Sequence, residues 1–178
     1  MDLSQYMPML VQGFGRNFLI VLLSMIVPLG LGILFTMLAC KKRNIEKVFS
    51  WVSLPFECIC PAALMVALYF GVFSFVHNAL LPIVVAFSIA FIGYMPARIN
   101  RSMSAGRNIA YNALGLFGAL YKWSFCVHIV AYQDLFAVAN IIRSRTYRME
   151  IMLVPLLVSF GILAVIEVLR RIIKNGAK

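Results

Sequence analysis

The protein has 178 residues, of which 63% are apolar, aromatic or cysteine and 12% carry a charge, against about 25% charged residues in an ordinary soluble domain. A single small core cannot hide that much apolar surface from water, so the composition excludes a soluble enzyme and predicts an all-α integral membrane protein. Lysine and arginine total 16 against six acidic residues, an excess that in membrane proteins indicates cytoplasmic loops and anionic lipid rather than nucleic acid.

The first apolar run, residues 17–39, contains 23 residues without a charge. At about 1.5 Å per residue, a helix of this length crosses a bilayer with some tilt. The chain before this run lacks the basic start of a secretory signal, and no small-residue cleavage site follows the run. We therefore expect this run to be a transmembrane helix of the mature protein.

Two further spans are predicted at residues 48–76 and 79–97. The first of them contains a single charge, Glu57, and two prolines, Pro55 and Pro61. Proline removes a helical hydrogen bond and clashes with the preceding turn, so we expect this span to be kinked or broken.

The fourth span, residues 108–133, has the weakest pattern, because Lys122 interrupts it after 14 uncharged residues. An amphipathic segment follows at 134–148, with one apolar helical face formed by Leu135, Val138, Ile141 and Ile142. It is expected to be either an interfacial helix or an outer-face helix that shapes a vestibule and meets a partner. The last span is predicted at 151–173, which gives five crossings in one domain, residues 1–178.

The basic residues gather in residues 40–47, in 98–107 and at the end of the last span, which together hold 11 of the 16. The positive-inside rule then places the amino terminus outside and the carboxyl terminus in the cytoplasm. An odd number of spans agrees with this orientation.

Sequence motifs for catalysis are absent. The chain has no phosphate-binding G-x-x-x-x-G-K-[ST], no H-E-x-x-H and no G-x-S-x-G, so we do not expect an enzyme. Cys58 and Cys60 offer two thiols for a soft metal such as Cu(I), but no histidine or further cysteine stands nearby in sequence. We expect them to act as small apolar groups and predict no metal site.

Two charges within apolar runs are candidates for a pathway through the membrane. Glu57 costs on the order of 2–4 kcal/mol in lipid unless it is paired or hydrated, so it either lines a pathway or lies at an interface. Lys122 is either a cation facing a substrate or a side chain that extends its ammonium group to the membrane edge. The sequence leaves both alternatives open.

Three segments in the second half resemble a known family. Residues 122–125 read KWSF, residues 134–135 read DL, and residues 144–148 read SRTYR. They are similar to the K-[DN]-[ST]-S-L, [DE]-L-L-x-x-A and S-R-T-[YF]-R segments of the permease subunits of polar amino acid ABC importers. The order of spans and Pro61 also fit this resemblance, which is clearest over 106–150.

The resemblance implies a multi-pass permease of the bacterial inner membrane. Its implied partners are cytosolic ABC ATPases that bind ATP and Mg²⁺, a second permease in a homodimer or heterodimer, an extracytoplasmic substrate-binding protein and membrane lipid. This chain would itself hold no cofactor. The candidate pathway residues of the chain are Lys122, Ser124, Glu57 and Arg145, and its candidate partner contacts are Arg98, Arg101, Arg107, Arg143 and Arg148.

The chain departs from the family at two motifs. The family's coupling helix, G-x-x-E-A-A-x-A-L-G, corresponds to residues 106–115, where Ile109 replaces the glutamate, and R-G-T-P is replaced by the CICP of residues 58–61. With this match, 106–118 is a cytoplasmic coupling helix and the fourth crossing shortens to 119–133. Two functions follow: a permease that imports a polar amino acid or similar small solute, or a permease-derived scaffold of a larger membrane complex without transport of its own.

Overall fold

The computed structural model describes residues 3–41, 51, 53–76, 78–95, 98–99 and 103–175. These residues form helices and connecting turns, with no strand among them. A short 3-10 turn, η1 (Leu3–Tyr6), leads into the long helix α1 (Met7–Lys41). Arg101 and the basic residues of 42–47 lie outside the described residues.

The middle of the chain forms shorter helices. Helix α3 (Pro61–Ala67) continues into a π-helical turn, η2 (Leu68–Val72), and α4 (Leu80–Ala90) follows. The rest comprises α5 (Ala105–Ser124), the 3-10 turn η4 (Val127–Val130), α6 (Leu135–Thr146), the 3-10 turn η5 (Met149–Met152) and α7 (Leu153–Asn175).

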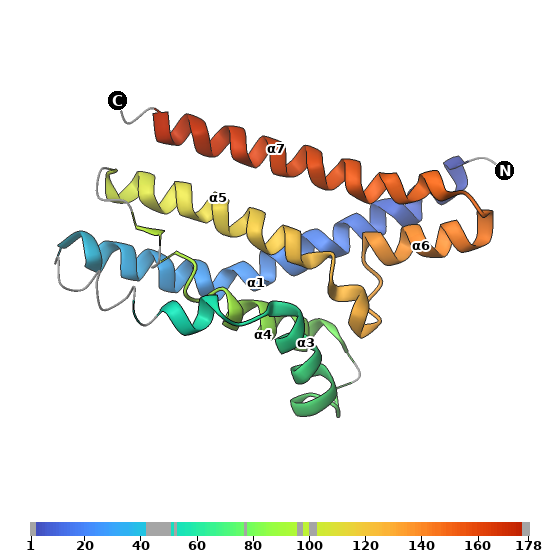
Figure 1. The fold of residues 1–178 in the computed structure, drawn as a ribbon, viewed down its shortest axis with the longest axis horizontal. Coiled ribbons are helices and arrows are strands. Elements are labelled where there is room, and N and C mark those ends of the chain that lie inside the picture. Colours follow the sequence, from blue (N-terminus) through green and yellow to red (C-terminus); the bar gives the residue numbers. More distant parts are fainter. Residues whose placement is uncertain are drawn as a thin grey trace.

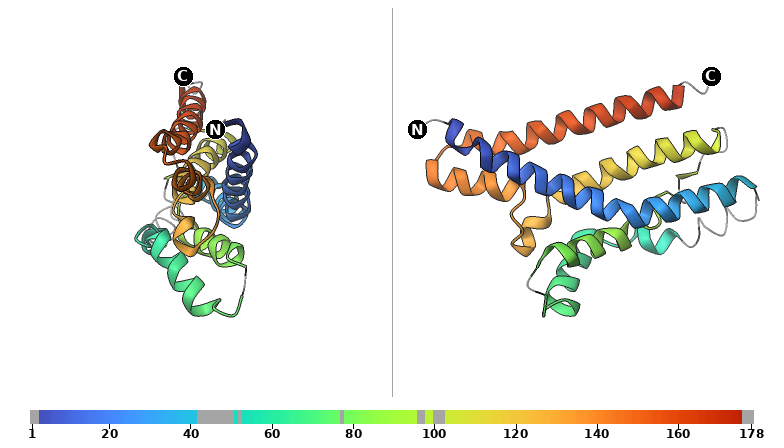
Figure 2. Two further views of the ribbon diagram at one scale, coloured as in Figure 1. Left: turned by 90° about the vertical axis from the view of Figure 1, so that its right-hand side faces the viewer. Right: turned by 180° about the vertical axis from the view of Figure 1, so that it is seen from behind.

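Helix α5 lies between α1 and α7 and packs against both (Figure 1). Gly118 on α5 faces Ile166 and Leu163 of α7, and a glycine at such a contact lets two helices approach closely. Helix α1 also packs against α4 and α6, and α3 packs against α4. Figure 2 shows α3 and α4 on the side of the molecule opposite to α7.

The buried core sits where α1, α3, α4 and α5 meet. Its fully buried large side chains include Ile20, Met65, Phe87, Leu120 and Tyr121. A smaller cluster joins the start of α1 to α6 through Leu10, Leu135, Val138 and Ile142. The face of 134–148 that the sequence predicts to be apolar is thus the face that α6 buries.

Two helical stretches among the described residues are long and apolar enough to cross a membrane, Met7–Leu38 and Met149–Asn175. Both expose many large apolar side chains, such as Val11 and Ile26 on α1 and Phe160 on α7. The other three crossings stay predictions. Helix α4 ends at Ala90, before the predicted boundary at 97, and α5 ends at Ser124, before the predicted boundary at 133.

The second predicted span is broken, as its prolines predict. Residues 53–57 are helical, residues 58–60 are not, and α3 begins at Pro61. Cys60 is extended, with φ −73° and ψ 114°, because the ring of a following proline disfavours the helical conformation. Proline itself is favoured in the first helical position, where its missing N–H is not needed.

Residues 106–118 do not form a separate short helix. They belong to α5, which is continuous through Lys122. Helix α1 ends, α5 begins and α7 ends at the same end of the molecule (Figure 1). The basic side chains of Arg107, Arg170, Arg171 and Lys174, at the start of α5 and the end of α7, therefore lie towards one end.

Candidate functional site

A cavity of about 550 Å³ opens beside the break at residues 58–60. Three parts of the chain line it: residues 56–61, the end of α4 with the turns after it, and α5. The lining side chains are Phe56, Glu57, Cys58, Ile59, Cys60, Pro61, Ala90, Phe91, Tyr94, Arg98, Ala119 and Trp123. A volume of this size is typical of sites for small molecules.

An ion pair forms the polar part of the cavity wall. The Arg98 guanidinium donates a hydrogen bond from Nη1 to Glu57 Oε1 at 2.7 Å. The same Nη1 donates to the Tyr94 carbonyl oxygen at 3.1 Å, and the guanidinium carbon lies 4.1 Å from the centre of the Tyr94 ring. The Glu57 and Arg98 side chains are 41% and 43% exposed, so their mutual attraction is worth no more than about 1 kcal/mol. A ligand that offers both charges can therefore replace it at low cost.

A glycine allows the two sides of the cavity to approach each other. A Cβ atom at Gly93, in the turn after α4, would lie 2.8 Å from the Ser53 carbonyl oxygen and 3.2 Å from Phe56 Cβ. These are backbone-bound atoms that cannot move aside independently. Gly93 thus fixes the distance between the helical residues 53–57, which carry Glu57, and the segment that carries Tyr94.

We expect Gly93→Ala to lower the free energy of unfolding by about 1–3 kcal/mol, because the added methyl group forces residues 53–57 away from the α4 turn. Thermal unfolding of the purified protein in mild detergent measures this loss. Gly30→Ala is the matched control, since a Cβ at Gly30 would meet no atom within 4 Å. Equal unfolding temperatures for the two variants would contradict the role assigned to Gly93.

The cavity is connected to α5 through a backbone group. Asn112, which is fully buried on α5, donates a hydrogen bond from Nδ2 to the Arg98 carbonyl oxygen at 3.1 Å. Asn112 belongs to residues 106–115, the segment that resembles a coupling helix. Gly115 of the same segment faces the Tyr94 hydroxyl, which would lie 2.7 Å from a Cβ at that position. Two residues of the cavity wall, Tyr94 and Arg98, thus lie against this segment.

A second polar cluster joins α1, α5 and α6. Asn17 on α1 donates from Nδ2 to Ser124 Oγ at 3.3 Å and accepts from the Leu135 N–H at 3.0 Å. The Ser124 hydroxyl donates to the Tyr121 carbonyl oxygen at 2.8 Å. Both Asn17 and Ser124 are fully buried. Ser124, a predicted pathway residue, thus lies in a contact between helices and outside the cavity lining.

Asp134 caps α6 and is also buried. Its Oδ1 accepts a hydrogen bond from the Ala137 N–H at 2.7 Å, while Oδ2 has no hydrogen-bond partner among the described residues. Burial raises the pKa of Asp134 from 3.8 to about 6, although the Ala137 hydrogen bond and nearby His128 act in the opposite direction. The fold therefore favours the protonated carboxyl group.

The raised pKa predicts that stability decreases as pH rises through about 6. An acid whose pKa is higher in the folded than in the unfolded protein contributes stability that is complete below the unfolded value and is lost above the folded one. We expect Asp134→Asn, which keeps the capping oxygen, to remove roughly 2–3 kcal/mol of this pH dependence. Unfolding temperatures between pH 4 and pH 7 measure it, with exposed Glu150→Gln as control. Parallel pH profiles for the wild type and Asp134→Asn would contradict the prediction.

The other predicted site residues within the described ranges do not line the cavity. Lys122 is exposed on α5, next to Trp123 of the cavity wall, and Arg145 is exposed on α6. Arg107 is exposed near the start of α5. Arg143 donates from Nη1 to Met149 Sδ at 3.6 Å, and Arg148 lines a shallow pocket of about 250 Å³ with Glu150. Of the predicted site residues that the structure describes, an ion pair joins Glu57, a predicted pathway residue, to Arg98, a predicted partner contact.

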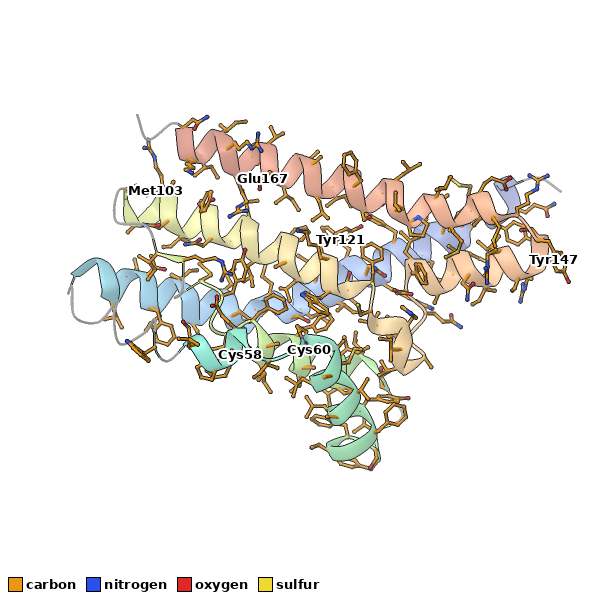
Figure 3. All side chains as sticks on the ribbon, in the orientation of Figure 1. Cys58, Cys60, Met103, Tyr121, Tyr147 and Glu167 are labelled. Carbon is orange, nitrogen blue, oxygen red and sulfur yellow. The ribbon has the colours of Figure 1, made fainter. Side chains whose placement is uncertain are left out.

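Two other features among the described residues offer fewer polar groups for binding a ligand. A hollow of about 600 Å³ between α1 and α4 is lined almost entirely by apolar side chains. Its polar lining residues are engaged, since Ser88 Oγ donates to the Ser24 carbonyl oxygen and Asn78 Oδ1 accepts from the Leu80 N–H. No group of three or more metal-ligating side chains occurs among the residues searched, and Cys58 and Cys60 are both exposed beside the break (Figure 3).

Comparison with solved structures identifies the arrangement of helices. The chain matches a chain in a structure described as the crystal structure of an amino acid ABC transporter with histidines, with a TM-score of 0.76 over 98% of both chains. The fold is permease-like. At 19% sequence identity, the similarity concerns the fold alone. No family model matches the sequence, and no curated protein matches it significantly.

The cavity lies beside the two segments at which the sequence departs from the family that it resembles. The break at 58–60 lies in the segment that replaces R-G-T-P, and Asn112 and Gly115 belong to the segment that resembles the coupling helix. Sequence reasoning missed Tyr94, Asn112 and Asn17, because the search for site residues considered charged side chains within apolar runs and left uncharged polar ones aside. The buried asparagines on α1 and α5 were the available clue, since an amide at membrane depth needs a partner.

Proposed function

We propose that this chain is the permease subunit of an ABC transporter that imports an amino acid, and that the cavity at residues 56–61 is its binding site. The observation that carries the proposal is the Glu57–Arg98 pair, a carboxylate and a guanidinium 2.7 Å apart in the wall of a cavity within a permease-like fold. An amino acid carries the complementary ammonium and carboxylate on a single carbon.

The binding step is an exchange of ion pairs. The ammonium group of the amino acid donates to the Glu57 carboxylate, and its carboxylate accepts from the Arg98 guanidinium, whose planar fork suits a carboxylate. Tyr94 keeps the guanidinium in place through its ring and its carbonyl oxygen. In this assignment Arg98 takes the contact for which the sequence had suggested Lys122. Lys122 remains a candidate for the wall of a pathway shared with a second permease.

Transport in this proposal requires partners. ATP and Mg²⁺ would bind to separate cytosolic ATPases, whose cycle rocks two permeases and alternates access to a site near the middle of the membrane. The chain itself would catalyse no reaction. The exposed apolar faces of α1 and α7 support burial against lipid or a second permease, and the basic side chains at one end of α5 and α7 support a cytoplasmic location for that end. An extracytoplasmic binding protein would deliver the substrate.

The decisive experiment is purification of the tagged chain in mild detergent, followed by identification of its partners and reconstitution into liposomes. We expect an ABC ATPase to co-purify. We also expect ATP, supplied on the side of the liposome membrane that carries the ATPase, to drive amino acid uptake. A complex that contains the ATPase but moves no amino acid would contradict the proposed substrate. A complex without an ATPase would contradict the transporter assignment.

One observation favours the second function, a permease-derived scaffold. Ile109 stands where the resembling family has a glutamate, and it packs against the buried core. This position therefore offers no carboxylate to a cytosolic partner. The two functions differ in their ATPase response, since a scaffold should leave ATP hydrolysis unchanged when amino acid is added. Stimulation only in the presence of a sibling permease would assign the contact with the ATPase to that sibling.

A further inference from the structure

The part of the cavity wall beyond the ion pair has a chemistry that selects among amino acids. Once Glu57 and Arg98 hold the ammonium and the carboxylate, the side chain of the amino acid meets the remaining lining residues. Most of these are apolar or aromatic, and they come from different elements: Phe56 and Ile59 from the break, Phe91 from the turn after α4, and Trp123 from α5.

The polar groups left in this wall are few and uncharged. Cys58 and Cys60 contribute thiols, which are soft and only weakly polar. The Tyr94 ring lies against the Arg98 guanidinium, and its hydroxyl points toward α5 at Gly115. Among the described lining residues no second carboxylate and no second cation remains. A charged side chain packed against this wall would therefore meet no counter-charge among the described lining residues, which is unfavourable.

The wall offers aromatic surface instead of further charged groups. The Phe91 and Tyr94 rings lie 6.2 Å apart at an interplanar angle of 46°, a tilted arrangement that aromatic pairs favour. Phe56 and Trp123 add two more rings to the same wall. Rings and sulfur atoms attract aromatic and thioether side chains beyond the gain from burial alone.

We propose that the cavity selects amino acids with a large uncharged side chain, aromatic or thioether, over those with a charged side chain. This inference rests on the proposed function, because Glu57 and Arg98 must hold the two charged groups of the amino acid. The preference follows from the wall formed by Phe56, Ile59, Phe91 and Trp123.

Intrinsic fluorescence measures binding at the wall directly. The chain has two tryptophans, and Trp51 is 77% exposed and does not line the cavity. A Trp51→Phe variant of the full chain in mild detergent therefore reports on Trp123 alone. We expect L-phenylalanine and L-methionine to change this fluorescence at concentrations at least about tenfold lower than L-arginine, L-lysine or L-glutamate, the scale set by burial of an unpaired charge.

A substituted wall provides the reverse test. Ile59→Asp places a carboxylate beside the half-buried position of Ile59, so we expect it to weaken L-phenylalanine binding and strengthen L-lysine binding, each about tenfold. Ile59→Val is the matched control that keeps the wall apolar. Gel filtration and helical circular dichroism show whether each variant is folded.

The outcomes separate the inference from the proposed function. Tighter binding of L-arginine or L-lysine than of L-phenylalanine would overturn the side-chain preference and leave the amino acid permease intact. Equal binding of L-phenylalanine and 3-phenylpropanoate, which lacks the ammonium group, would overturn the role of Glu57 and leave the apolar preference intact. No response to any amino acid up to millimolar concentration would overturn both.

Discussion

Neutralising either member of the ion pair is expected to lower amino acid uptake by about 10- to 100-fold. The substitutions are Glu57→Gln and Arg98→Gln. Each removes one hydrogen bond between a charged side chain and the substrate, a contact worth about 1.5–3 kcal/mol. Uptake of radiolabelled amino acid by liposomes that contain the whole complex measures the effect. Because both side chains are about two-fifths exposed, the unfolding temperature should change little.

The double variant separates binding from a purely structural ion pair. If the two residues only bond to each other, each single change leaves an unpaired charge, and Glu57→Gln with Arg98→Gln together should recover much of the uptake. If they hold the substrate, the double variant should remain at least as inactive as the single ones. Glu150→Gln and Arg171→Gln remove the same charges at exposed positions outside the cavity lining and should have no effect.

Replacing Asn17 by leucine is expected to cost about 2–4 kcal/mol of unfolding free energy. The amide joins Ser124 on α5 to the first residue of α6, and its loss leaves the buried Leu135 N–H without an acceptor. A buried polar group left unpaired costs about 1–3 kcal/mol. Thermal unfolding in detergent and the yield of folded chain measure the loss.

Two control variants test whether the lost hydrogen bonds of Asn17 cause the loss of stability. Asn140→Leu makes the same change at an exposed position of α6 and should leave the unfolding temperature within a few degrees of the wild type. Ser124→Ala should cost less than Asn17→Leu, because Asn17 keeps its bond to the Leu135 N–H. A variant Asn17→Leu as stable as Asn140→Leu would show that this cluster does not hold α6 on α1.

Features that depend on neighbouring residues were predictable from the sequence. The break before Pro61 follows from proline geometry, and the apolar face of α6 follows from its helical spacing. Length and hydropathy identified two long helices: residues 17–39 lie within α1, and residues 151–173 cover the end of η5 and most of α7. Each of these signals is local in the chain, so one sequence is enough to show it.

Features that depend on packing between distant segments were not predictable. Glu57 and Arg98 are 41 positions apart, and nothing in either surrounding sequence states that they meet. The close approach at Gly93 depends on Ser53, and the burial of Ser124 depends on Asn17. The hydropathy pattern also does not mark the end of α5, because residues 125–133 remain largely apolar although the helix stops at Ser124. Apolarity predicts burial, and it does not distinguish helix from turn.

The bond from Asn112 to the Arg98 carbonyl oxygen ties one wall of the cavity to α5. If the cavity binds an amino acid as proposed, a shift of α5 that moved the Arg98 backbone would change the separation of its guanidinium from Glu57, and with it the affinity. For a protein that docks at that end, thermodynamic linkage is reciprocal: the factor by which docking changes the affinity for the amino acid equals the factor by which the amino acid changes the affinity for the docked protein. In a transporter of the proposed kind, a bound substrate would thus have two effects: it would bind to the charged side chains of the cavity, and it would change the affinity with which the energy-supplying subunit is bound.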